Sequence, residues 1–260
     1  MGGQIVDLVT LAIAATPAFI ASGVEFVEAT TIVLAVGITR GWRAPLVGSA
    51  LAALTLAIIV ATLGVALVTV VPEKFLLGLV GTLLLLFGLR WLRKAVLRFA
   101  GIVALHDEEE IYRREVADLR AQGLKRTQWD WVGTIVAYKA VLLEGTEVAF
   151  IVIAFGAKGI AAMNAAILGA IAAGVIVTAV AAALRQPLTA VPENWMKFGV
   201  GAMLSSFGVF WFGEGIGTQW PGDAASIPVI LGVFLAASWF AVRMLRGLLP
   251  EGARVEARNV

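Results

Sequence analysis

The chain has 260 residues, of which 60% are hydrophobic and 15% are charged, and its mean hydropathy is +0.93. These values exclude an ordinary soluble domain and indicate a polytopic membrane protein that is embedded in a lipid bilayer. The chain has no cysteine and one histidine, His106, in a charged loop, which excludes disulfides, thiolate metal sites and multi-histidine centres. The net charge of +2 does not indicate a nucleic acid partner, because Lys and Arg gather at the ends of apolar segments, where they determine topology.

Crossing the hydrocarbon core of a bilayer takes about 20 apolar residues in a helix, and seven segments of the chain fit that length. They are residues 8–38, 44–71, 73–93, 131–157, 159–184, 192–213 and 226–243. The stretch at 98–130 instead mixes acidic and basic residues with apolar ones between them. This pattern predicts a charged amphipathic helix on the membrane surface, which could also recruit a cytoplasmic partner.

The two halves of the chain repeat each other. Val71-Pro-Glu73 recurs as Val191-Pro-Glu193, and in the same register Trp91 falls on Trp211. These matches predict a three-helix unit that occurs twice and is followed by a seventh helix. The predicted parts are a first repeat at 1–97, a cytoplasmic linker at 98–130, a second repeat at 131–213, and an outer loop, seventh helix and cytoplasmic tail at 214–260.

An odd number of spans in each unit determines the predicted topology. If the linker stays on one face of the membrane, the second copy must be inverted relative to the first, as in secondary transporters. The predicted fold class is therefore all-α, with seven transmembrane helices as a 3+3 inverted repeat plus one C-terminal helix. Lys and Arg are concentrated in the first, third and fifth loops and the tail, which predicts an outside N-terminus and a cytoplasmic C-terminus.

Two acidic motifs interrupt the first and fourth apolar segments, Glu25-Phe-Val-Glu28 and Glu144-Gly-Thr-Glu147. A charged side chain at the bilayer centre costs at least ~2.5 kcal/mol on insertion scales, so such residues indicate a functional site. Residues three apart project from one helical face, and inverted-repeat transporters bind substrate near the midplane between their repeats. We therefore expect the four glutamates to surround one space, where their oxygens would bind a hard cation.

Further polar residues in these segments are candidates to complete or tune the site. They are Ser22, Thr30, Thr31, Thr146 and Lys139. Pro17 and Gly145 predict local unwinding near the glutamates, which would expose backbone carbonyls as ligands. Carboxylates that crowd together compete for protons and titrate as a coupled group, which predicts exchange of metal for protons. The competing interpretation is structural, with protonated glutamates or glutamates that pair with Lys139.

The second motif carries a resemblance to a known family. Leu143-Glu-Gly-Thr-Glu147 and its apolar continuation resemble the Arg-Glu-Gly-x-Glu motif of the oxidase-dependent iron permeases, which have seven spans, an outside N-terminus and the motif on their first and fourth helices. This resemblance implies that Glu25, Glu28, Glu144 and Glu147 bind the ion. The family's arginine is replaced by Leu143 in this copy.

The first motif resembles a second group as well. Glu25-Phe-Val-Glu28-Ala-Thr30 is similar to the Glu-x-Gly-Asp-Lys-Thr signature of the calcium and manganese exchangers in the lysine-exporter-like superfamily, without its glycine and lysine. The two resemblances together imply cation transport through paired acidic motifs, in the inner membrane of a bacterium or an archaeon.

We therefore expect a transporter, not an enzyme, that moves iron, manganese or calcium, with protons as counter-ion and no permanent cofactor. The chain lacks a nucleotide-binding glycine loop and a cysteine nucleophile, which enzymes of several classes require. Two alternatives remain: an exporter of amino acids or other small organic solutes, for which only Lys139 could supply a positive group, and a membrane scaffold or assembly protein that acts through 98–130. A homo-oligomer is compatible with each function.

Overall fold

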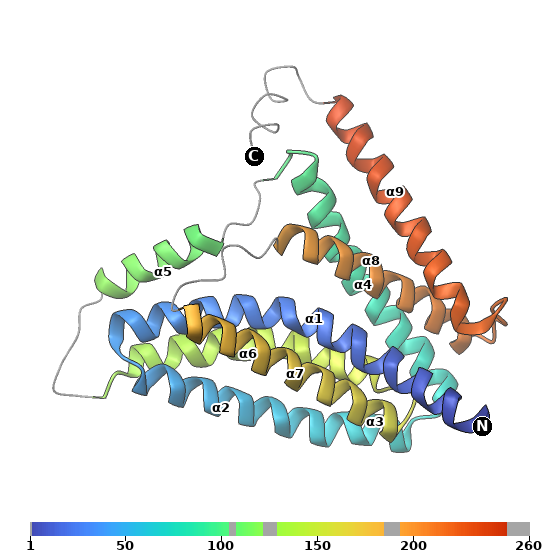
Figure 1. Ribbon diagram of the computed structural model, residues 1–260, viewed down its shortest axis with the longest axis horizontal. Coiled ribbons are helices and arrows are strands. Elements are labelled where there is room, and N and C mark those ends of the chain that lie inside the picture. The colour runs from blue at the N-terminus through green and yellow to red at the C-terminus, as the bar shows by residue number, and fades with distance from the viewer. Residues whose placement is uncertain (1, 104–107, 122–128, 185–192, 249–260) are drawn as a thin grey trace. The chain divides into compact units, whose positions relative to one another are not determined.

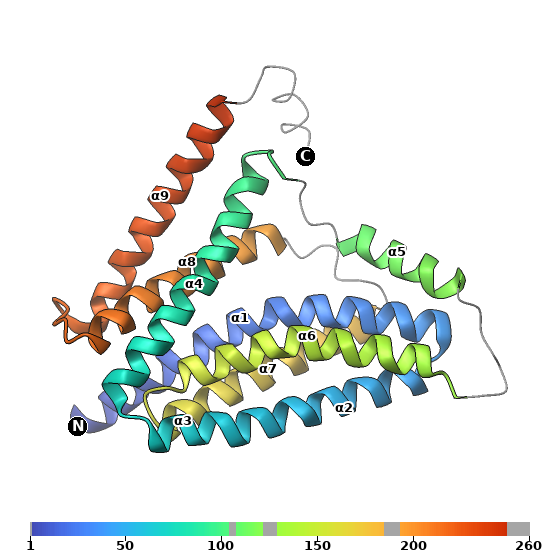
Figure 2. The same ribbon diagram turned by 180° about the vertical axis from the view of Figure 1, so that it is seen from behind.

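The computed structural model is all-helical and describes residues 2–103, 108–121, 129–184 and 193–248, among which there is no strand. Figures 1 and 2 show its helices from two opposite sides. The α-helices are α1 (Gly2–Arg40), α2 (Arg43–Ile59), α3 (Val65–Val70), α4 (Glu73–Phe99), α5 (Glu108–Ala121), α6 (Trp131–Phe155), α7 (Ile160–Leu184), α8 (Glu193–Gly215) and α9 (Ser226–Leu248). A π-helical segment, η1 (Val60–Gly64), joins α2 to α3, and a 3-10 turn, η2 (Asp223–Ala225), precedes α9.

Five of these helices have the length and composition to cross a membrane. They are Leu11–Arg40, Arg43–Gly64, Glu73–Phe99, Ile160–Leu184 and Asp223–Leu248. The chain is therefore a multi-pass membrane protein. The helices α6 and α8 are not among the five, although they have 25 and 23 residues.

The described helices form two compact units, and each unit contains parts of both sequence repeats. One unit consists of Met1–Val70 and Asp107–Val191, and the other consists of Val71–His106 and Pro192–Val260. Each unit therefore combines segments that lie far apart in the sequence. In the first unit α1 packs on α6 and α7, and α2 packs on α6, while in the second α4 packs on α8.

The helices α1 and α6 lie side by side and run antiparallel (Figures 1 and 2). Two contacts far apart along α1 establish this direction, since Val36 meets α6 at Gly133 and Glu25 meets it at Glu144. Both helices are continuous through the acidic motifs, and α1 includes Pro17. The expectation of local unwinding beside the glutamates is therefore wrong for these two helices, because their backbone keeps its own hydrogen bonds.

An irregular turn follows α2 instead. The segment η1, Val60–Gly64, is π-helical, a form that mostly appears as single turns in α-helices, frequently at functional sites. Gly64 lies against α6 and α7 there, since a Cβ at this position would be 3.4 Å from Ile153 and 3.3 Å from Met163.

In the second unit, glycines allow α4 and α8 to approach closely in an antiparallel pair. A Cβ at Gly88 would lie 2.5 Å from the backbone nitrogen of Ser205, and one at Gly208 would lie 2.5 Å from that of Leu85. Small residues of this kind let the backbones of membrane helices come together. The helix α9 contacts the same pair, and Arg246 Nε donates a 2.8 Å hydrogen bond to the carbonyl oxygen of Phe99.

Candidate metal site

Three of the predicted glutamates meet where α1 and α6 contact each other. Carboxylate oxygens of Glu25, Glu28 and Glu144 lie within 4.8 Å of one another. Glu25 is 1% exposed, and the other two are half-buried. Two come from α1 and one from α6, so only the packing of these two helices assembles the group.

The spacing of these oxygens suits a bound cation. Oxygen ligands lie about 2.0 to 2.6 Å from magnesium or calcium, so two oxygens on opposite sides of such an ion are roughly 4 to 5 Å apart. The carboxylate oxygens, within 4.8 Å of one another, are no farther apart than such a pair. Carboxylates, unlike thiolates or imidazoles, are the donors that hard cations favour.

The structure leaves Glu147 outside this group of three. It lies one helical turn beyond Glu144 on α6 and is half-buried. Lys139, the predicted ion-pair partner, is exposed on α6. Lys139 is five residues before Glu144, which places it on another side of the helix from that carboxylate.

The predicted hydroxyl ligands serve their own helices. Thr31 Oγ1 donates a 2.9 Å hydrogen bond to the carbonyl oxygen of Val27, and Thr146 Oγ1 donates one of 2.6 Å to that of Leu143. Such bonds to the preceding turn are usual for threonine in a helix. Thr30 is half-buried, and Ser22 is fully buried one turn before Glu25.

A cavity of about 530 Å³ opens beside the carboxylates within the first unit. It is lined by α1, α2, the π-helical segment, α6 and α7, and its polar side chains are Glu25, Glu144 and Asn164. On α7 the lining begins at Ile160 and on α6 it ends at Val152. The cavity therefore leads from the carboxylates toward the turn that joins α6 to α7.

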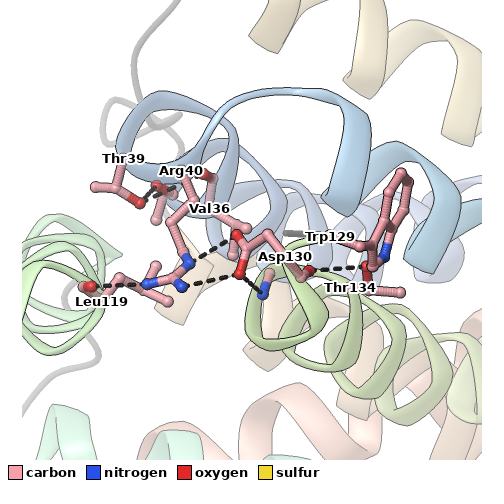
Figure 3. A network of polar contacts seen from close by, with 9 residues as sticks. Val36, Thr39, Arg40, Leu119, Trp129, Asp130 and Thr134 are labelled. Atoms are coloured by element: carbon pink, nitrogen blue, oxygen red, sulfur yellow. Dashed lines mark hydrogen bonds and ion pairs between the residues drawn. The ribbon is translucent and has the colours of Figure 1, made fainter. Parts of the chain in front are cut away.

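A second polar group lies at the opposite end of α1 and α6 (Figure 3). Arg40 Nε and Nη2 each donate a 2.8 Å hydrogen bond to one oxygen of Asp130, and Arg40 Nη1 donates one of 3.0 Å to the carbonyl oxygen of Leu119 on α5. Asp130 also caps α6, accepting a hydrogen bond from the Gly133 backbone nitrogen at 3.2 Å, a favoured role for aspartate at a helix N-terminus. This network thus joins α1, α5 and α6.

The charges around this network alter two acidic pKa values outside the spans. The hydrogen bond from Arg40 lowers the pKa of Asp130, against the opposing effect of burial. In α5, burial and then the nearby charge of Asp118 raise the pKa of Glu115. The Asp130 carboxylate is therefore ionised at neutral pH, as its bidentate contact with Arg40 requires.

Carboxylates gathered between two helices of a multi-pass membrane protein indicate a functional site. Comparison with protein families gives the particular group: the model of the family described as ferrous iron uptake permease, iron-lead transporter matches residues 11–242. The chain belongs to this family, and metal ion transport is the function that the family indicates. No curated protein and no solved structure matches the chain.

The sequence predicts the glutamates but not two features around them. From the sequence, Asn164 is predicted only as a polar contact between helices, because one amide in an apolar helix gives no pattern that indicates a cavity. Arg40 is predicted only as a topology determinant and Asp130 only as part of the linker. The position of Asp130 immediately before Trp131, at the start of an apolar segment, is the signal that indicates a helix cap.

Proposed function

We propose that the protein transports a divalent metal cation through a site formed by Glu25, Glu28 and Glu144, with Glu147 as a further ligand during transport. The observation that carries this proposal is the meeting of three carboxylates from two helices within 4.8 Å. Carboxylates so close together are stable as anions only when a positive charge compensates them. A metal ion supplies that charge at the site.

Ferrous iron is the cation that we propose first, because the matching family carries that ion in its description. Manganese and calcium are the competing ions, since carboxylate sites accept all three. Protons are the proposed counter-ion: coupled carboxylates that release a metal take up protons in its place. The direction of transport would follow from the gradients of both ions.

We further propose that the spans form a 3+3 inverted repeat with one added helix, in which α6 and α8 are the fourth and sixth spans in chain order. Equivalent helices support this arrangement, since α1 and α6 are antiparallel and so are α4 and α8. If α1 corresponds to α6 and α2 to α7, the contact of α1 with α7 corresponds to that of α6 with α2, and both contacts are present. Glu25 and Glu144 are equivalent residues that meet each other, which is the geometry expected on a pseudo-twofold axis.

The proposed topology places the N-terminus outside and the C-terminus and α5 in the cytoplasm, on the strength of the Lys and Arg distribution. In that orientation the cavity leads to the outer side of the membrane, and the Arg40–Asp130 pair lies at the cytoplasmic side. A bacterial or archaeal inner membrane remains the proposed location.

Transport of an organic solute is the second candidate, and the cavity is the observation that favours it. A volume of about 530 Å³ is in the range of small-molecule sites. Its charged lining residues are Glu25 and Glu144, and Lys139 is not in the lining. This cavity would suit an organic cation better than an amino acid, whose carboxylate needs a positive partner.

Flux into proteoliposomes tests the proposal. Ferrous iron, ferric iron, manganese and calcium are offered separately, with a pH gradient either applied or collapsed. The wild type is compared with the Glu25→Gln, Glu144→Gln double variant and with Glu73→Gln, a matched control at an exposed acid in the first turn of α4. We expect ferrous iron flux that the double variant loses and the control keeps.

Two results would contradict the proposal. If none of the metals enters wild-type vesicles, the cation proposal is wrong and organic cations become the substrates to test. If metal enters equally well through the double variant, the carboxylates are structural. If metal flux does not depend on the pH gradient, the proposal that protons are the counter-ion is wrong, while the proposed metal site still stands.

A further inference from the structure

The Arg40–Asp130–Leu119 network lies on the same two helices as the carboxylates, but at their other end. Arg40 is 15 residues after Glu25 on α1, and Asp130 is 14 residues before Glu144 on α6, so the network is roughly 20 Å from the carboxylates along the helices. The Arg40 side chain is 5% exposed and that of Asp130 is 16% exposed. The contact is therefore a partly buried ion pair, which is stronger than a typical surface pair.

Between the network and the carboxylates, α1 and α6 are in close contact. A Cβ at Gly133 would lie 3.2 Å from Val36, and both Val36 and Ala137 are 0% exposed. The cavity, in contrast, has no lining residue between 130 and 140 on α6. The carboxylates thus adjoin open space toward the α6–α7 turn and closed packing toward α5.

The two ends also differ in sequence, although the repeats are related. At the offset of 119 residues that aligns the acidic motifs, the equivalent of Arg40 is Gly159 and the equivalent of Asp130 is Leu11. The equivalent end therefore cannot form the same ion pair. The Arg40–Asp130 contact thus has no counterpart at these equivalent positions, and it lies at the end where the two helices are in close contact.

We propose that Arg40 and Asp130 are the gate residues that close the α5 end of the α1/α6 pair, with α5 held to the gate through the carbonyl of Leu119. The cation of the proposed transport function would pass toward α5 only after this contact breaks. Arg40 and Asp130 are positioning residues, since neither contacts the three clustered glutamates. That a cation passes this gate rests on the proposed function, whereas the gate itself is inferred from the contacts described above.

The absence of native cysteine provides a clean test by thiol accessibility. Ala137→Cys places one thiol in the closed segment, seven residues from both Asp130 and Glu144. In a separate chain Val152→Cys places one in the cavity lining. A charged, membrane-impermeant methanethiosulfonate reagent is applied to the full-length protein in detergent micelles, where both ends face the reagent, and the rate of modification is measured by mass.

Each cysteine is combined with Arg40→Gln, with Arg40→Lys and with the control Arg43→Gln, which removes an exposed arginine from the same end. Opening of the gate predicts that Arg40→Gln accelerates modification at Ala137→Cys at least tenfold and slows it at Val152→Cys. Arg40→Lys keeps the charge without the bidentate contact and should give an intermediate rate. Arg43→Gln should change neither rate.

Two outcomes would overturn the gate. If Arg40→Gln leaves the rate at Ala137→Cys unchanged, the ion pair does not control access. If it raises the rates at both positions together, the pair merely holds the fold, a conclusion that Arg40→Lys would check should the glutamine variant not fold. No transported ion takes part in this measurement, so failure of the metal proposal would leave its result interpretable.

Discussion

The helix pairs α1/α6 and α4/α8 contain different kinds of residue where they meet. Both pairs are antiparallel, and each joins a helix from the first half of the chain to one from the second half. In α1/α6 the contact contains Glu25 and Glu144, whereas in α4/α8 it contains Gly88 and Gly208. One pair thus surrounds charge and the other brings two backbones together.

Under the proposed function, this difference assigns transport to the α1/α6 pair and mechanical support to the α4/α8 pair. Membrane helices gain no hydrophobic free energy from contact with each other and depend on close packing, which glycine permits. Buried carboxylates weaken packing and are stable only with a partner or an ion. We therefore expect α4/α8 to be the rigid element and α1/α6 to be the responsive one.

The largest expected effect comes from enlarging the glycine contact. Gly88→Leu with Gly208→Leu would put side chains where a Cβ alone already lies 2.5 Å from the facing backbone, and overpacking costs about 1 to 3 kcal/mol at each site. We expect little folded protein, measured as the monodisperse fraction and thermal midpoint in detergent. Gly199→Leu on α8, with no atom within 4 Å of its Cβ position, should behave as wild type; equal loss would refute the contact.

The next largest effect distinguishes the contributions of individual glutamates to metal flux. Glu25→Gln removes a member of the close group, whereas Glu147→Gln alters a residue outside it. Even outer partners of metal ligands change affinity 10- to 100-fold, so we expect about a 100-fold loss of metal flux for the first and about 10-fold for the second. Equal losses would show that all four glutamates act together, and unchanged folding by thermal midpoint is the control.

A smaller effect concerns the ion pair outside the glutamate site. The pKa of Asp130 is lowered in the folded protein, so its stabilisation is complete above the ordinary aspartate pKa and is lost as pH falls through the lowered value. Asp130→Asn should therefore reduce the free energy of unfolding by about 2 kcal/mol, equally at pH 8 and pH 6. Thermal denaturation at both pH values measures this, and a difference that appeared only at pH 6 would contradict it.

The smallest effect is expected at the lysine of α6. Lys139 is exposed and outside the cavity lining, so Lys139→Gln should leave metal flux within about twofold of wild type, as surface charges contribute little. A loss comparable to that of Glu25→Gln would mean that the lysine is a functional partner of the glutamates. Flux at saturating and limiting metal concentration separates binding from turnover.

Composition predicted the helical membrane class. Motif spacing predicted four glutamates around one space, because an ionisable side chain in an apolar helix is costly unless it faces a partner or an ion, and three of the four meet. The glycine matches of the repeats carry little weight in the sequence, since glycine is common in membrane helices. Their role is visible only with the register of α4 against α8. Similarly, the contact of Arg40 with Asp130 spans 90 residues, and no local pattern indicates such a distant partner.

The unwinding expected beside the glutamates was wrong for a physical reason. Pro17 lies inside α1 without breaking it, since a neighbouring helix can support the turn around a proline in a membrane. The irregular turn occurs instead at Val60–Gly64, where the sequence contains no proline. Its small residues permit this turn but do not require it.

The glycine contact of α4 with α8 also determines where the chain will exchange its amide hydrogens most slowly. Backbone amides near Gly88 and Gly208 lie against another helix with no side chain between them, so water can reach them only if the whole pair separates. Amides that open only by such global events have the highest protection. Deuterium uptake should therefore be slowest in the segments around Gly88 and Gly208, whether the proposed gate in the α1/α6 pair is open or closed.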